Sequence, residues 1–208
     1  MKLVCMSKPN QLTTLRILLT PVLALALLYE ESFWALGIFV AAALTDWYDG
    51  YVARNFGGAT RTGKYLDPLA DKLLVMTAFG IFAYLEYVPV WMFWAIALRD
   101  ILITALRAYA MSADKQFETS SVAKWKTATQ MLSIFLLLIW IIASQSYAGE
   151  KTPFVIQEIQ DWNLVWSMLL LVTLYTLYTG VLYLLDNRRH LKSLAMAFYR
   201  VFVPTNVR

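Results

Sequence analysis

Long runs of apolar side chains alternate with short polar turns along almost the whole chain. Six runs have about the 20 residues that an α-helix needs to cross the hydrocarbon core of a bilayer. They cover residues 12–29, 33–54, 63–84, 90–111, 122–144 and 162–185. Glu30 and Glu31 mark the turn after the first run, and Glu86 and Pro89 mark the turn after the third. The pattern predicts an all-α, polytopic membrane protein with six transmembrane helices.

The segments outside these runs are short. Pro9 and Asn10 are typical of a turn followed by a helix start, which we expect at the membrane interface. Residues 186–208 form a basic, partly apolar C-terminal tail that we expect to lie along the interface. We detect no repeat and no linker that would separate a second domain. The chain is therefore predicted to form one membrane domain over residues 1–208.

Composition supports the membrane assignment. Apolar residues make up 60% of the chain and charged residues only 15%, which leaves too little polar surface for a soluble globule. Cys5 is the only cysteine, so an internal disulfide and a cysteine-based zinc cluster are excluded. His190 is the only histidine, and its place in the basic tail favours a solvated surface group.

Positive charge is distributed unevenly among the turns. If both termini face the cytoplasm, 17 of the 18 Lys and Arg residues lie on the cytoplasmic side, and only Lys151 lies outside. The opposite turns carry mainly Glu and Asp. This is the positive-inside pattern of membrane proteins. We therefore expect a multi-pass protein of the cytoplasmic (inner) membrane, with both termini and the turn between spans two and three inside.

Four carboxylates flank that turn, at Asp46, Asp49, Asp67 and Asp71. Their spacings of three and four residues place each pair on one helical face, and we expect two antiparallel helices to bring the pairs together. Four neighbouring carboxylates cannot all ionise without a cation. Ligation by carboxylates alone favours Mg²⁺ or Mn²⁺, and four of them are enough for two ions. The sequence predicts a metal site that opens toward the cytoplasm.

Small and basic residues accompany the carboxylates. Gly50, Ala53 and Gly63 would leave room for a phosphate-bearing ligand, and Arg54 could pair with its phosphate. The alternative is that these small residues serve helix packing, since such residues are favoured where membrane helices touch. Both interpretations remain open at this stage.

A second, basic cluster comprises Arg99, Arg107, Lys124 and Lys126. Its functional interpretation is a pocket for the phosphate of an acceptor beside the metal site. Two simpler interpretations compete. Arg99 lies well inside an apolar run, and its role could be limited to pairing with a carboxylate such as Asp100. The role of the two lysines could be limited to setting the membrane topology at the interface.

The eight motif positions, with their spacings, resemble the signature of the CDP-alcohol phosphotransferase family. The resemblance implies a six-span membrane enzyme, usually a homodimer, that transfers a phosphatidyl or related group from a CDP-linked donor to an alcohol and releases CMP. It implies that the four aspartates hold the metals and that Asp71 is also the general base. It further implies that the cytidine diphosphate site is lined by Gly50, Ala53, Arg54 and Gly63.

Further positions resemble the family members that make phosphatidylglycerophosphate. These are residues 9–13 with Arg16, residues 62–72, residues 99–101 with Arg107, and Lys124-x-Lys126-Thr127. Ala123 stands where those members have glycine. The resemblance implies CDP-diacylglycerol as donor and sn-glycerol 3-phosphate as acceptor, whose phosphate would be bound by Arg99, Arg107, Lys124 and Lys126.

Other functions remain possible on the sequence alone. The same chemistry could serve phosphatidylglycerol, as in a cardiolipin synthase, or serine or an inositol phosphate, although the basic cluster disfavours serine. A divalent-cation transporter would spread its carboxylates along a path through the membrane, whereas here they lie at one depth. A purely structural scaffold is the remaining alternative.

Overall fold

The computed structural model describes residues 8–56, 63–112, 122–147 and 153–188. Within them the chain is helical and contains no strand, which confirms the all-α prediction there. The predicted interfacial tail lies outside the described residues from position 189 onward. The helices are α1 (Lys8–Leu28), α2 (Ser32–Phe56), α3 (Gly63–Tyr84), α4 (Val90–Ser112), α5 (Val122–Ser146), α6 (Phe154–Asp161) and α7 (Leu164–Asp186).

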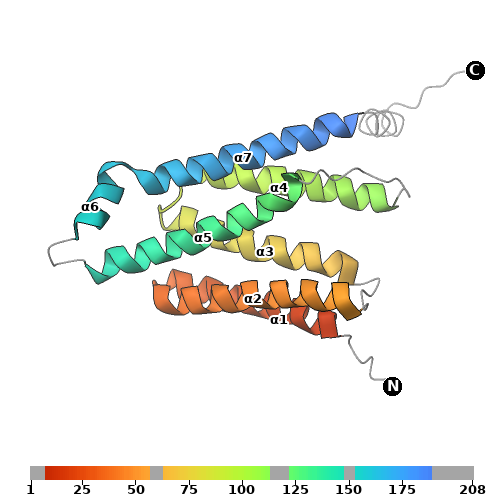
Figure 1. Cartoon of the computed structure of the whole chain (residues 1–208), viewed down its shortest axis with the longest axis horizontal. Helices are drawn as coiled ribbons and strands as arrows, with labels where there is room; N and C mark the ends of the chain where they lie inside the picture. Colours follow the sequence, from red (N-terminus) through yellow and green to blue (C-terminus); the bar gives the residue numbers. More distant parts are fainter. Residues whose placement is uncertain (1–7, 57–62, 113–121, 148–152, 189–208) are drawn as a thin grey trace, which may run out of the picture.

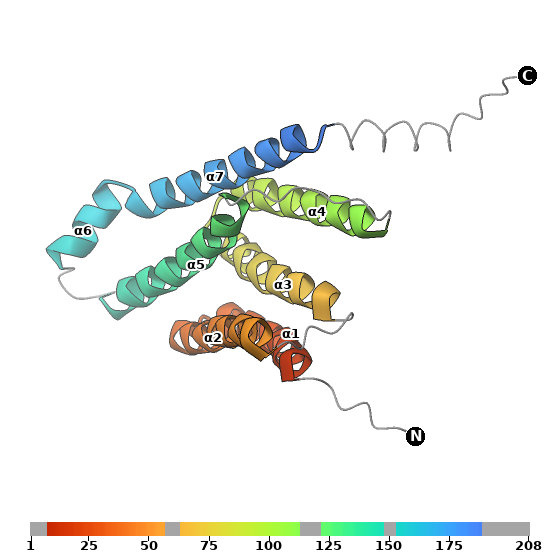
Figure 2. The ribbon, with the colours of Figure 1, turned by 45° about the vertical axis from the view of Figure 1, so that its right-hand side comes forward.

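The six long helices run up and down in alternation (Figure 1). α1, α3 and α5 start toward one end of the bundle, where α2, α4 and α7 finish. We call this the motif end, because α2 finishes and α3 starts there with the two halves of the aspartate motif. The short α6 was not predicted. It lies at the opposite end, set at an angle between α5 and α7 (Figure 2).

Two turns at that opposite end share the same backbone conformation. Glu30 after α1 has φ 58° and Glu86 after α3 has φ 64°, the left-handed conformation that commonly ends a helix. The next amide donates back five residues, from Glu31 to the Ala26 carbonyl at 2.9 Å. Tyr87 repeats this bond after α3. The turns that the sequence predicted are therefore Schellman-type caps made without glycine.

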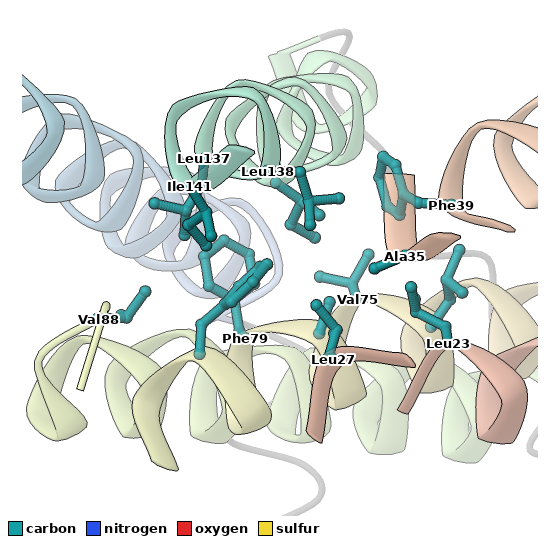
Figure 3. Close-up of a cluster of buried hydrophobic side chains, with 14 of the residues drawn as sticks. Leu23, Leu27, Ala35, Phe39, Val75, Phe79, Val88, Leu137, Leu138 and Ile141 are labelled. Carbon is teal, nitrogen blue, oxygen red and sulfur yellow. The ribbon is translucent and has the colours of Figure 1, made fainter. Parts of the chain in front are cut away.

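A core of buried apolar side chains joins α1, α2, α3 and α5 (Figure 3). Leu27 of α1, Phe39 of α2 and Phe79 of α3 are at most 4% exposed, as is Leu138 of α5. α1 packs along both α2 and α3, and α7 packs along α4 and α5. Because the core lies away from the motif end, polar groups can gather at that end without interrupting it.

The outer surface is more apolar than that of a soluble bundle. α7 exposes Leu171 to 68% and Leu174 to 56%, while its Thr173 and Thr176 are fully buried. Large exposed side chains on other helices include Leu18, Phe33 and Leu98. A helix that turns its polar side inward and its leucines outward suits lipid rather than water.

Two helical segments are long and apolar enough to cross a membrane, within the part of the chain that the structure describes. They are Trp125–Ser146 and Leu164–Asp186, and the apolar stretches Thr13–Leu28 and Ser32–Tyr48 are shorter. α3 and α4 carry charged residues in their middle turns, such as Lys72 and Asp100. The six-span count thus stays a prediction.

Candidate functional site

Asp46 of α2 is paired with a cation from α1. Arg16 places its Nη1 2.8 Å from Asp46 Oδ1. The arginine side chain is only 1% exposed, whereas that of Asp46 is 48% exposed. The buried guanidinium therefore holds the carboxylate from behind and leaves its other side open. The sequence marked Arg16 only as a topological charge and as part of the family resemblance, so its contact with the motif was missed.

Asp71 of α3 lies within electrostatic range of Asp46 and Arg16. Its Oδ1 is buried and has no hydrogen-bond partner among the described residues. Buried carboxylate oxygens are normally hydrogen-bonded or coordinate a metal. This oxygen therefore fits the predicted role of a metal ligand.

The motif helices pack mainly against α1. The sequence predicted that antiparallel α2 and α3 would bring the two pairs of aspartates together, and this stays a prediction because the side chains of Asp49 and Asp67 are outside the description. In the described residues both helices pack along α1 and make few contacts with each other. α1 supplies Arg16, which pairs with Asp46 of α2 and acts electrostatically on Asp71 of α3.

The remaining motif residues lie in the same two helices. Asp49, Gly50, Ala53 and Arg54 lie in α2, and Gly63 and Asp67 lie in α3, at positions whose side chains are outside the description. Among the residues that the structure describes, no three potential metal ligands form a group. The metal site and the cytidine diphosphate site stay predictions, and Asp46 and Asp71 are their described members.

A second cluster forms around Asp100 of α4. Its Oδ1 accepts hydrogen bonds from Lys126 of α5 and, at 3.2 Å, from Arg99 Nη1. Its Oδ2 lies 3.4 Å from Lys72 Nζ of α3. Asp100 and Lys126 are each 3% exposed. The predicted alternative that Arg99 pairs with Asp100 is therefore confirmed. The Arg99 side chain also has a second environment besides this carboxylate.

That environment is a polar pocket of about 60 Å³ among α3, α4, α5 and α7. One water needs roughly 10–15 Å³ on this measure, so the pocket has room for a small group of several atoms. Four cationic side chains line it, and Asp100, which contacts three of them, lies outside the lining. Its lining consists of Lys72, Arg99, Ile103, Thr104, Arg107, Lys126, Thr127 and Tyr183.

Three of the four predicted acceptor-binding residues thus come together in one pocket. Arg99, Arg107 and Lys126 line it, while the side chain of Lys124 lies outside the description. Lys72, which the sequence had counted only as a topological charge and within the resemblance, completes the set. The charges of Lys72 and Lys126 also reach Asp71, so the basic pocket and the aspartate motif are neighbours.

α7 supplies one wall of this pocket, which the sequence did not predict. Arg99 Nη2 donates to Thr179 Oγ1 at 3.0 Å, and the Arg107 guanidinium lies 5.5 Å from the centre of the Tyr183 ring. The available signal was a row of threonines, at positions 173, 176 and 179, spaced three apart in an otherwise apolar helix. Such a row marks a buried polar face.

The family model for CDP-alcohol phosphatidyltransferase matches residues 6–174, which is most of the chain. The chain belongs to this family. The match begins before α1 and ends within α7, so it includes the aspartate motif and the four cations of the basic pocket but not Thr179 and Tyr183.

Curated relatives carry a more specific name, CDP-diacylglycerol–glycerol-3-phosphate 3-phosphatidyltransferase. The protein of Cereibacter sphaeroides is 35% identical over 64% of this chain and 63% of its own length. That of Bacillus subtilis is 33% identical over 63% of this chain and 76% of its own length. That of Escherichia coli K12 is 34% identical over 76% of this chain and 90% of its own length. The chain thus spans less than two thirds of the Cereibacter relative.

Proposed function

We propose that this protein transfers the phosphatidyl group of CDP-diacylglycerol to sn-glycerol 3-phosphate, giving phosphatidylglycerophosphate and CMP. The names of the relatives support both substrates. The observation that carries the proposal is the basic pocket beside Asp71, because an acceptor with its own phosphate needs cations next to the reacting centre.

The described residues divide the work between binding and proton transfer. Lys72, Arg99, Arg107 and Lys126 bind the phosphate of the acceptor and direct its free hydroxyl toward Asp71. Asp71 accepts the proton of that hydroxyl while the hydroxyl oxygen attacks the phosphorus that bears the diacylglycerol. The bond from this phosphorus to CMP breaks, and CMP leaves with the electron pair. Holding both substrates in line supplies much of the rate enhancement.

The donor lies on the other side of Asp71 in this proposal. Asp46, Asp49, Asp67 and Asp71 would hold two Mg²⁺ or Mn²⁺ ions, which would supply charge neutralisation for the diphosphate. Arg16 orients Asp46 for this role. The cytidine diphosphate portion lies along Gly50, Ala53, Arg54 and Gly63.

The membrane setting follows from the surface. We infer that all six long helices cross the cytoplasmic membrane, with the motif end inside. The diacylglycerol tails then remain in the lipid while the soluble acceptor enters from the cytoplasm. We infer, from the family resemblance, that two copies form a homodimer.

Acceptor identity is the part of the proposal that needs a direct test. CMP release from CDP-diacylglycerol is measured with glycerol 3-phosphate, phosphatidylglycerol, serine or an inositol phosphate as the acceptor. We expect release with glycerol 3-phosphate, since the pocket suits a small phosphorylated molecule. Release only with phosphatidylglycerol or only with serine would contradict the proposed acceptor, and preference for the inositol phosphate would reassign the pocket to that molecule.

A further inference from the structure

One buried carboxylate, Asp100, contacts three cationic side chains that come from three helices. Its partners are Lys72 of α3, Arg99 of α4 and Lys126 of α5. Asp71 also lies within electrostatic range of Lys72 and Lys126. With Arg107, however, the pocket has four cations against these two carboxylates, so an excess of positive charge remains. Burial of unmatched charge is unfavourable, and a cluster built for stability alone would balance its charges. The excess indicates an anion as a further partner.

Asp100 leaves most of its partners' donors free. A lysine ammonium has three N–H donors and an arginine guanidinium has five. All three cations line the pocket, whereas Asp100 is not part of its lining. Arg99 is held from two sides, because its other terminal nitrogen donates to Thr179 of α7. The carboxylate thus lies behind the cations and can act on a bound anion only through them.

We propose that Asp100 is a positioning residue, which fixes Lys72, Arg99 and Lys126 around the pocket so that the phosphate of the acceptor meets prearranged donors. The inference rests on the proposed function for the identity of the acceptor. Prearranged donors improve affinity because they need not be ordered during binding.

The opposite effect is conceivable, since a carboxylate competes with phosphate for the same cations. The geometry favours positioning. Without Asp100, Lys126 would be a buried ammonium beside two other cations. Repulsion and burial would drive it out of place or remove its proton. For acceptor affinity, the loss of ordered donors then outweighs the benefit of removing a carboxylate that competes with the phosphate.

The sign of the effect on acceptor affinity tests the proposal. Asp100→Asn keeps the size of the side chain and removes its charge. We expect the KM for glycerol 3-phosphate to rise by about tenfold or more, while the KM for CDP-diacylglycerol changes by less than about twofold. Asp100→Glu should restore most of the affinity. Asp161→Asn, an exposed carboxylate in α6 at the opposite end, is the matched control.

An unchanged or lower KM for glycerol 3-phosphate in Asp100→Asn would overturn the proposal and favour competition. Equal rises in both KM values would assign Asp100 to general folding. If Asp100→Asn does not fold, Thr179→Val tests the same idea, because it removes the second contact of Arg99 together with a bond within α7 to the Thr176 carbonyl. We then expect a smaller rise, confined to the acceptor, and no rise would count against prearrangement.

A second measurement does not require the reaction. Thermal stabilisation by inorganic phosphate is compared in the detergent-solubilised wild-type protein and in Asp100→Asn. We expect the variant to need about tenfold more phosphate for the same shift. Equal responses, or no response of the wild type, would overturn the positioning role. Wild-type protein that responds to phosphate but forms no CMP from glycerol 3-phosphate would instead refute the proposed acceptor and retain Asp100.

Discussion

At the scale of single residues, the contact between Arg16 and Asp46 best explains how a charged site exists inside an apolar bundle. The guanidinium is almost fully buried, and its Nε and Nη2 atoms have no hydrogen-bond partner among the described residues. A buried cation is unfavourable unless a carboxylate compensates it. Asp46 supplies that compensation and is held in one orientation in return.

We therefore expect Arg16→Gln to weaken the proposed metal site. Groups that orient metal ligands contribute about 10–100-fold to metal affinity. The Mn²⁺ concentration that gives half-maximal CMP release should rise by a factor in this range. The measurement is a metal titration in detergent micelles.

Arg16→Lys is the control for charge, since it keeps the cation and loses the planar group. It should lie between the wild type and Arg16→Gln. A half-maximal Mn²⁺ concentration that is unchanged or lower in Arg16→Gln would show that Arg16 does not orient Asp46 for metal binding.

At the scale of elements, α7 has a larger role than its sequence indicates. Gly180 leaves space for the side chain of Arg99 between α4 and α7. A Cβ atom at this position would lie 2.8 Å from Arg99 Cγ and 2.9 Å from Nε. Contacts this close force a shift, and the flexible arginine moves more readily than a helix backbone. The helix thus helps to place Arg99 in the basic pocket.

Gly180→Ala should accordingly raise the KM for glycerol 3-phosphate several-fold, because Arg99 is displaced from Asp100 and Thr179. The melting temperature should change little. Gly37→Ala in α2 is the matched control, since a Cβ there has nothing within 4 Å. The KM for glycerol 3-phosphate is measured by steady-state kinetics for both variants. Identical values in Gly180→Ala and Gly37→Ala would contradict this role of α7.

The elements also show what the sequence could and could not predict. The turns at Glu30 and Glu86, the long helices and the neighbourhood of Arg99, Arg107 and Lys126 followed from local patterns. The position of α1 along both α2 and α3 did not, because the packing of helices depends on contacts between segments far apart in the sequence. The contribution of Thr179 was also missed. The spacing of the threonines indicates a polar face, but it does not indicate which residue, here Arg99 80 positions away, that face contacts.

At the scale of the whole molecule, polar and apolar material is separated along the bundle. The apolar core joins the helices away from the motif end, and the aspartates and the basic pocket lie toward that end. The outer faces expose leucine, phenylalanine and tryptophan. Such a molecule suits a bilayer, and in the proposed topology the reaction lies close to the inner surface.

Sidedness can be measured with single cysteines in a Cys5→Ser background. Glu31→Cys lies in the turn after α1, and Arg188→Cys follows α7 at the motif end. A membrane-impermeant maleimide should label Glu31→Cys in intact bacterial cells and Arg188→Cys only in inverted vesicles. Labelling of Arg188→Cys in intact cells would place the motif end outside and contradict the proposed topology.

The most direct test of the central claim follows both products of the proposed transfer. Purified protein is incubated with CDP-diacylglycerol, radiolabelled glycerol 3-phosphate and Mg²⁺ or Mn²⁺. The account predicts that label enters the lipid fraction in amounts equal to the CMP released, and that chelation of the metal stops both. Release of CMP without labelled lipid, or transfer that continues without the metal, would contradict it.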